Sequence, residues 1–218
     1  MGGQKRFVCE RCGQRFDVSA EALARYPGWT PKRCLRCRDA SRTGSSKPNP
    51  QRKKKRAAPG NLTLAQVLLR YTDGPKTGIF TDGSAQPNPG PGGWGVVYVQ
   101  DDRVVRQKHG QAEQTTNNRM ELTALIEGYQ LAPEGTELDC WTDSELCFKT
   151  MTEWAPGWKQ RGWRRKAGEI KNLDLVKQLY ALVLARPEIR LRWIAAHSGK
   201  RWNEYADSLS TAWARDEL

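Results

Sequence analysis

The sequence predicts an α/β protein with a mixed β-sheet, preceded by a small module held together by cysteines. Three strand-like apolar runs, GIFTDG, GWGVVYVQ and RVVRQKHG, follow one another closely. After them helical and strand-like segments alternate, and strands joined by helical crossovers run parallel. Two CxxC pairs stand well before these runs. At 218 residues the chain has room for one ordinary domain and one small module.

The elements of the larger domain follow in a definite order. TTNNRMELTALIEGYQL opens with capping Thr and Asn side chains and continues as a helix with Leu122, Leu125 and Ile126 on its buried stripe. ELDCWTD is strand-like and ends on Asp143, and helices then continue through Ala185. EIRLRWIAA gives another strand and NEYADSLSTAWA a last helix. Ahead of them all, LTLAQVLLRY is apolar enough for a short helix packed on this domain.

Four carboxylates stand out because each lies in a short motif of its own: Asp82, Glu121, Asp143 and Asp207. Acids without His or Cys ligands suit Mg²⁺, and two such ions about 3.5 to 4 Å apart can support displacement at a phosphodiester. The alternative is four solvated acids among the 24 Asp and Glu residues of the chain. The residues alone therefore indicate a metal-dependent phosphodiester enzyme of mixed α/β class.

Longer motifs carry a more specific signal. In chain order they are TDGS, NPGPGGWG, TTNNRMEL, WTDSELC, GWKQRGWRRK, KNLDL and HSGKRWNEYAD. Through them the stretch from Gly78 to Ala214 resembles ribonuclease H of type 1. The resemblance implies the ribonuclease H fold, a mixed five-stranded sheet with helices on both faces. It also implies an endonuclease that hydrolyses the RNA strand of RNA/DNA hybrids and leaves 3′-hydroxyl and 5′-phosphate ends.

The same resemblance assigns roles to single residues. The four carboxylates would hold two Mg²⁺ ions, with Mn²⁺ as the alternative ion and Asp207 as the outermost ligand. His197 matches a mobile-loop histidine that helps proton movement or the release of product and metal. Thr116 and Asn172 resemble parts of a pocket that grips a phosphate of the DNA strand. Minor-groove contacts fall to three asparagines, Asn88, Asn117 and Asn118.

Other positions depart from the family pattern or match nothing in it. Gln114 stands where some relatives carry arginine, which predicts a weaker phosphate pocket. Glu145 stands where some carry glutamine, and we do not count it as a fifth metal ligand. His109 is predicted to lie on the surface. Cys140 and Cys147, in apolar contexts, are predicted to be small buried residues.

The segment TEWAPGWKQRGWRRKAGEIKN interleaves aromatic and basic side chains, a pattern typical of nucleic-acid binding. The family places a basic protrusion here, against the DNA strand. Trp154 and Trp158 are expected mainly to pack a helical hairpin, with exposure expected for Trp163 and the arginines. The predicted substrate contacts are Trp158, Lys159, Arg161, Trp163 and Arg164.

Positive charge is concentrated at the start of the chain. Residues 1–76 hold 18 Lys and Arg against 5 Asp and Glu, a net charge of +13. Residues 77–218 hold 18 against 19, a net charge of −1. A nearly neutral domain with a strongly basic extension predicts an appended arm that attracts additional nucleic acid.

Residues 1–40 contain two CxxC knuckles, Cys9 with Cys12 and Cys34 with Cys37. Their spacing suits a tetrahedral Cys₄ site for one structural Zn²⁺, and so small a segment buries too little apolar surface to fold unaided. We predict a zinc-ribbon-like module, with redox cysteines or an iron centre as alternatives. Disulfides are disfavoured because nothing marks the chain as secreted. Arginines around the knuckles suit phosphate contacts, and protein docking is the alternative use.

The remaining segments complete the predicted organisation. Residues 41–60, rich in Ser, Pro, Gly and basic side chains, form a basic flexible linker, 61–76 a short helix and connector, and 77–218 the catalytic domain. The basic run 52–56 resembles a nuclear address, although the expected location is the cytoplasm. The sequence shows no membrane-spanning stretch or signal peptide, and we expect a monomer without membrane partners. The final RDEL is interpreted as the end of a charged helix.

Two other functions would use the same residues. A non-catalytic hybrid-binding protein would have lost a carboxylate, yet all four are present. A nuclease for DNA or for junctions would share the acids, but the Asn-rich groove motifs and the basic protrusion favour the hybrid. Cleavage of hybrid against duplex decides between these possibilities.

Overall fold

The computed structural model describes residues 4–25, 30–37, 62–165 and 168–215. The chain divides into two compact units, Met1–Ala58 and Pro59–Leu218, and each is described by itself. The predicted linker 41–60, with its basic run, lies outside the described residues, as do the last three residues of the chain. Within the described ranges, no helix combines the length and the apolar character needed to cross a membrane.

The N-terminal unit is a β-hairpin followed by a short helix. Its elements are β1 (Gln4–Val8), β2 (Arg15–Ser19) and α1 (Ala20–Arg25). The two strands are antiparallel, and Phe7 faces Phe16 with 6.0 Å between ring centroids. Among the described residues of this unit, the buried positions are Cys9, Pro31 and Cys34. So little buried surface indicates a module that needs a cross-link to be stable.

The larger unit is built on one five-stranded sheet. Its strands are β3 (Gly78–Ala85), β4 (Gly90–Gln100), β5 (Arg103–Thr115), β6 (Leu138–Thr142) and β7 (Ile189–Trp193). They lie in the order β5-β4-β3-β6-β7. β3, β4 and β5 are antiparallel neighbours, whereas β6 runs parallel to β3 and β7 parallel to β6. The predicted mixed five-stranded sheet is confirmed, and the parallel strands are those reached through helices.

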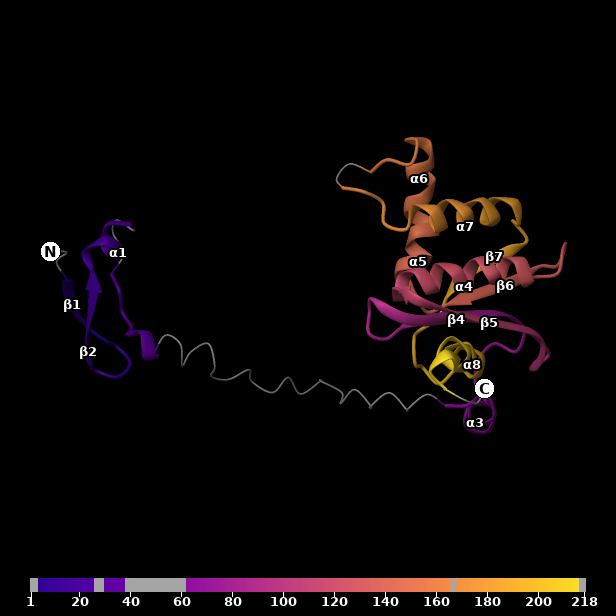
Figure 1. Ribbon diagram of the computed structural model, residues 1–218, viewed down its shortest axis with the longest axis horizontal. Helices are drawn as coiled ribbons and strands as arrows, with labels where there is room; N and C mark the ends of the chain where they lie inside the picture. The colour runs from indigo at the N-terminus through magenta and orange to yellow at the C-terminus, as the bar shows by residue number, and fades with distance from the viewer. Residues whose placement is uncertain (1–3, 26–29, 38–61, 166–167, 216–218) are drawn as a thin grey trace. The chain divides into compact units, whose positions relative to one another are not determined.

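Helices cover both faces of this sheet. They are α3 (Leu64–Arg70), α4 (Asn117–Leu131), α5 (Glu145–Lys149), the π-helical turn η1 (Thr150–Trp154), α6 (Ala155–Gln160), α7 (Leu173–Ala185), α8 (Arg201–Ser210) and the 3₁₀ turn η2 (Ala212–Ala214). Figure 1 shows α4 and α7 stacked on one side of the sheet and α8 with α3 on the other. α3 begins with a capping box between Thr63 and Gln66, and the predicted short helix is confirmed.

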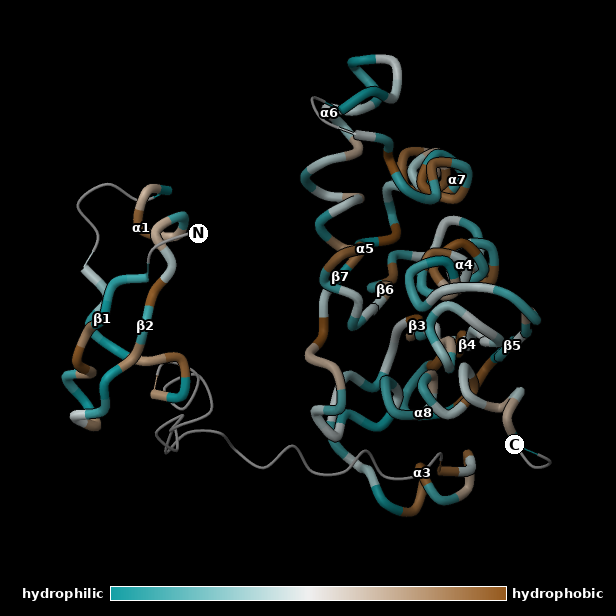
Figure 2. Tube along the Cα trace, turned by 60° about the vertical axis from the view of Figure 1, so that its left-hand side comes forward, coloured by the Kyte–Doolittle hydropathy of each residue, from teal (hydrophilic) through white to brown (hydrophobic). Residues whose placement is uncertain are grey.

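Each face of the sheet has its own hydrophobic core because neighbouring residues of a strand point to opposite sides. The core under α4 and α7 includes Ile79, Val96, Leu122, Leu125 and Tyr129. The core under α8 and α3 includes Val67, Phe80, Val97, Trp202 and Leu209. Figure 2 shows the apolar character of α7 and of part of α3. The central strands are therefore fixed from both sides.

Candidate active site

Two of the four predicted carboxylates lie side by side because their strands are parallel neighbours. β3 and β6 pair in register through Thr81 and Thr142. Asp82, the next residue of β3, and Asp143, just after β6, therefore stand at the same level of the sheet. Asp82 is only 6% exposed, and Asp143 is half-buried.

A close approach of α4 to β3 adds the third carboxylate. A Cβ at Gly83 would lie 2.2 Å from the backbone nitrogen of Glu121, so a larger residue at Gly83 would push the helix away. Thr116 caps the helix by accepting a hydrogen bond from the Arg119 N–H, and Glu121 follows in the next turn. Carboxylate oxygens of Asp82, Glu121 and Asp143 thus lie within 4.8 Å of one another.

The fourth carboxylate, Asp207, comes from α8 on the opposite face of the sheet. A Cβ at Gly95 would lie 2.4 Å from the Leu209 Cβ, so α8 packs tightly on β4. Asp207 groups with His197 and Glu204, whose candidate ligand atoms all lie within 4.8 Å of one another. The structure therefore brings three of the predicted acids together and places Asp207 with His197, within electrostatic reach of the three.

The loop that carries His197 is held at its base by α8. His197 and Gly199 have positive φ angles of 49° and 78°, so the loop turns sharply before the helix. The Gly199 N–H donates a hydrogen bond of 3.0 Å to Glu204 Oε1, and the Glu204 side chain is buried. The His197 imidazole is exposed on a loop whose base is fixed.

Burial and mutual repulsion raise the pKa values of these acids. Burial, followed by the neighbouring carboxylates, raises the pKa of Asp82 and of Glu121 well above their ordinary values. Burial also raises the pKa of Asp143 and brings that of Asp207 to about 6. Glu121 Oε2 is buried without a hydrogen-bond partner in the described chain. Divalent cations among these oxygens would offset the cost of burying the anions, so the donor set fits Mg²⁺ or Mn²⁺.

Three residues that contact the acids were not predicted from the sequence: Asn203, Glu204 and Ser210. Asn203 Nδ2 donates to Asp143 Oδ2 at 3.2 Å, and Ser210 Oγ donates to Asp82 Oδ2. All three are buried and lie on α8, three or four residues from Asp207. That spacing puts them on one helix face, and it is the signal that could have identified them.

The three predicted groove asparagines are held by hydrogen bonds to their amide oxygens. Asn88 Oδ1 accepts from the Asn117 N–H at 3.2 Å, and Asn117 Oδ1 accepts from the Ala85 N–H at 2.6 Å. Asn118 Oδ1 accepts from the buried Cys147 thiol at 3.4 Å. With each oxygen engaged, the amide NH₂ is the group that remains for a ligand.

Thr116 and Asn172 lie at the starts of two helices, α4 and α7. Arg119 connects the two places, because its Nη1 lies 3.4 Å from Asn172 Oδ1 and 3.3 Å from Asp174 Oδ1. Helix N-termini favour anions, and a guanidinium adds positive charge, although Asp174 offsets part of it. Gln114 is exposed near the end of β5.

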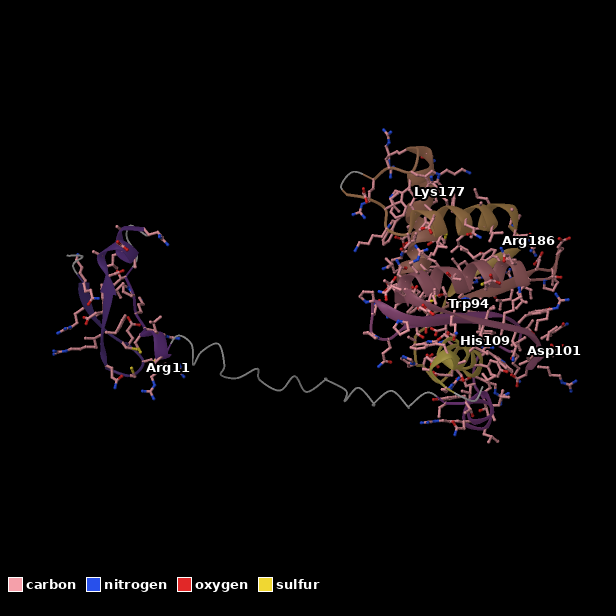
Figure 3. All side chains as sticks on the ribbon, viewed as in Figure 1. Arg11, Trp94, Asp101, His109, Lys177 and Arg186 are labelled. Atoms are coloured by element: carbon pink, nitrogen blue, oxygen red, sulfur yellow. The ribbon has the colours of Figure 1, made fainter. Side chains whose placement is uncertain are left out.

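The aromatic and basic segment forms η1, α6 and the turn after them, and one expectation about it is wrong. Trp154 is exposed at 37%, whereas Trp163 is half-buried and meets Tyr180 edge-on at 5.9 Å between centroids. The backbone N–H of Trp163 donates to the Trp158 carbonyl at 2.7 Å, and a φ of 62° turns the indole back toward α7. There Lys177, labelled in Figure 3, places its Nζ 5.8 Å from the centre of the Trp163 ring.

Trp154 instead lines a groove of about 410 Å³ beside the N-terminal part of α4. Its wall also includes Asn118, Leu122, Leu146 and Trp158. The three predicted cations of the protrusion are all exposed: Lys159, Arg161 and Arg164. The cations that line the groove are Arg165 and Lys171, so aromatic, apolar and basic side chains share its wall with the predicted substrate residue Asn118.

Four minor predictions agree with the structure. Glu145 lies outside the acid cluster, is exposed and forms an ion pair of 2.5 Å with Lys149. His109 is exposed, and Cys140 and Cys147 are both fully buried. Burial raises the pKa of the Cys147 thiol to about 12, so this thiol stays protonated as a donor.

The four cysteines of the N-terminal unit converge. Their sulfur atoms, from Cys9, Cys12, Cys34 and Cys37, all lie within 4.8 Å of one another, with 3.8 Å between Cys12 and Cys34. Ligands about 2.3 Å from a tetrahedral centre stand roughly 3.8 Å apart, so the set fits Zn²⁺. Backbone N–H groups, first that of Cys34, lower the pKa of the Cys9 thiol to about 6, as suits a thiolate ligand.

The strand order, the helices on both faces and the acids at the centre of the sheet together define the ribonuclease H class of nucleases. The family model described as RNase H matches residues 74–215. This chain therefore belongs to the ribonuclease H family.

Individual relatives agree with this assignment. A ribonuclease H of Methylorubrum extorquens is 44% identical over 143 residues, which cover 66% of this chain and 62% of that protein. A ribonuclease H of Chromohalobacter salexigens is 44% identical over 149 residues, covering 67% and 88%. This chain thus spans less than two thirds of the first relative and most of the second. The solved structure of LC9-RNase H1, a type 1 RNase H with the type 2 active-site motif, aligns with a TM-score of 0.53 at 34% identity, covering 65% and 74%.

Proposed function

We propose that this protein is an endonuclease that hydrolyses the RNA strand of RNA/DNA hybrids and leaves 3′-hydroxyl and 5′-phosphate ends. The observation that carries the proposal is the convergence of Asp82, Glu121 and Asp143, with Asp207 and His197 next to them, in a chain of the ribonuclease H family. Within the described residues of the larger unit, these two groups are the only sets of three or more potential metal-ligand side chains that converge.

Asp82, Glu121, Asp143 and Asp207 would hold two divalent ions, Mg²⁺ or Mn²⁺. Such ions supply a nucleophilic water near neutral pH and stabilise the leaving oxygen of a phosphodiester. The protein contributes the alignment. Ser210 fixes the Asp82 carboxylate and Asn203 fixes that of Asp143, so the oxygens are oriented before any ligand binds.

Hybrid recognition rests on donors aimed by the fold. The NH₂ groups of Asn88, Asn117 and Asn118 suit acceptors in a wide minor groove, where 2′-hydroxyls separate RNA from DNA. Thr116 and Asn172, with Arg119 between them, suit a phosphate of the DNA strand. The exposed cations Lys159, Arg161 and Arg164 would extend that grip, with Trp154 and Trp158 against the sugar and base faces. Trp163 supports this surface through α7.

His197 would move a proton near the reacting phosphate or help the product leave. Its imidazole is exposed and stands beside Asp207. Glu204 holds the base of the loop through the Gly199 N–H. The His197 side chain can therefore change rotamer while its backbone stays beside Asp207.

The N-terminal unit would be a zinc ribbon that holds one Zn²⁺ through Cys9, Cys12, Cys34 and Cys37 and strengthens nucleic-acid binding. The sulfur geometry supports the metal, and the net charge of +13 over residues 1–76 supports the polyanionic partner.

The test is cleavage of a labelled RNA strand in a hybrid with Mg²⁺, beside RNA duplex, single-stranded RNA and DNA duplex. Asp143→Asn should reduce the rate by on the order of 10³-fold, because one carboxylate supports several kcal/mol of transition-state stabilisation. Asp101→Asn, at an exposed turn outside the site, is the matched control. Tight binding without cutting would make the protein a hybrid reader, and cutting of DNA duplex would make it a different nuclease.

A further inference from the structure

Residues Leu62–Asp73, here called the strap, lie outside the region that matches the family, which begins at residue 74. The strap contains α3 and the extended residues after it. Figure 1 shows it against α8, on the side of that helix away from the sheet. It touches α8 at three places along the helix.

The first contact is at the C-terminal end of α8. The Leu62 carbonyl accepts a hydrogen bond of 2.6 Å from Ser208 Oγ and a second one from the Arg215 guanidinium. Ser208 is buried and directly follows Asp207. The strap therefore holds the helix at the residue next to the fourth carboxylate.

The second contact lies at the middle of α8. Val67, only 1% exposed, joins the core cluster that contains Trp202, Tyr205 and Leu209. Leu69, two residues along the same helix, is 87% exposed. Val67 is the side chain through which α3 is buried.

The third contact is at the N-terminal end of α8, beside the His197 loop. The Asp73 carbonyl accepts from the Arg201 N–H at 2.7 Å, and the Tyr71 carbonyl accepts from Arg201 Nε at 2.5 Å. The Asp73 carboxylate pairs with Lys200 Nζ, and the two residues form an isolated β-bridge. These bonds fix the two residues that join the loop to the helix.

α8 supplies three side-chain contacts to the candidate active site and its loop. Asn203 donates to Asp143, Glu204 anchors the loop, and Ser210 donates to Asp82. A small rotation or slide of the helix would shift these groups and Asp207 together. We propose that the strap is a positioning element of the active site. It fixes the position of α8 and of the His197 loop relative to the sheet. This inference rests on the proposed function for its catalytic consequence.

The pair formed by Asp73 and Lys200 is exposed, so its charge attraction alone contributes little. The pair matters because of its position, since it holds the residue that joins the His197 loop to α8. None of the residues assigned to the hybrid lies on the strap, so weakening the strap should change turnover and leave the affinity for the hybrid in place.

The experiment compares Val67→Ala with Leu69→Ala in the full chain, both changes lying on α3. Val67→Ala should lower kcat by roughly tenfold with an unchanged KM, because small misplacements of catalytic groups can cost up to about a hundredfold. Leu69→Ala should have the same kcat and KM as the unchanged protein. Hydrogen exchange of peptides covering residues 197–210, in protein without Mg²⁺, should be faster in Val67→Ala only.

Asp73→Asn provides a second variant that cannot fail through a lost core contact. It keeps the oxygen that accepts from the Gly74 N–H and replaces the charged oxygen that accepts from Lys200 with an amide NH₂. Faster exchange at residues 197–203, with Asp101→Asn as the control, should accompany a fall in kcat of about two- to fivefold. Unchanged exchange in both variants would overturn the inference. Changed exchange in a protein that cuts no hybrid would overturn the proposed function and leave the strap as a purely structural clamp.

Discussion

The two units gather metal-ligand side chains by opposite means. In the larger unit, two hydrophobic cores hold β3, β6, α4 and α8 in place, and the acids meet because their elements are fixed. In the N-terminal unit the cysteines converge although only three described positions are buried. The larger unit folds through its hydrophobic cores and so brings its acids together, whereas the N-terminal unit needs the bound metal in order to fold. Metal removal should therefore have different consequences in the two units.

The two parts of the chain also differ in net charge. The acids of the larger unit repel one another in a nearly neutral domain, while residues 1–76 carry a net charge of +13 against −1 for residues 77–218. A nuclease that needs bound cations at its centre cannot also surround that centre with fixed positive groups without competing for the same acids. Placing the attraction to nucleic acid on an appended unit avoids that conflict.

The largest expected effect concerns the pH dependence of the larger unit without metal. Burial raises the pKa of Asp207 from 3.8 to about 6. Below pH 4 this group is protonated in folded and unfolded chains alike, so it has no effect on stability there. As the pH rises to 6, the unfolded chain loses the proton while the folded one retains it. Stability should therefore fall by about 3 kcal/mol between these pH values, with Asp82 and Glu121 continuing the trend above them.

Denaturant unfolding followed by tryptophan fluorescence measures this dependence, since eight of the nine tryptophans follow residue 77. Asp207→Asn should flatten the curve between pH 4 and 6, and saturating Mg²⁺ should remove the decline at neutral pH. Asp174 and Glu188, whose pKa values are lowered by Arg119 and Arg186, lose their contribution below pH 4 and set the acid limit. A flat curve in metal-free protein would show that repulsion among the acids is not a feature of the folded state.

The second effect concerns the arm. Cys9→Ser combined with Cys34→Ser should abolish Zn²⁺ binding and unfold the N-terminal unit, while the main unfolding transition stays in place. Hybrid affinity at physiological salt should fall about tenfold, and kcat at saturating hybrid should not change. The salt dependence of hybrid binding separates the two uses of the module. A slope equal to that of the unchanged protein would mean that the module docks protein instead of nucleic acid.

How far the sequence predicted the molecule also differs between its parts. The sheet, the helix order and the strand end directly before Asp143 followed from apolar runs and turn residues, because these are local signals. The strand end expected near Asp82 is wrong, because β3 continues to Ala85. Ser210 was not predicted as a partner of Asp82, since 128 residues separate them and only the packing of α8 joins them. Trp154 packs against Trp158 as expected, with 6.0 Å between ring centroids. Trp163 was assigned the wrong exposure because the turn at this residue reverses the chain, and ring spacing alone does not show that.

The smallest expected effect concerns the proposed phosphate pocket for the DNA strand, which has Gln114 where some relatives have arginine. Gln114 is exposed near the end of β5, two residues before Thr116, the cap of α4. Gln114→Arg should tighten hybrid binding by about threefold and steepen the salt dependence by roughly 0.9, the value for one added phosphate contact. Gln111→Arg adds the same charge at another exposed position of β5 and serves as the control. Equal gains from both variants would mean that net charge is acting, whereas a gain confined to Gln114→Arg would locate the phosphate beside Thr116, Asn172 and Arg119.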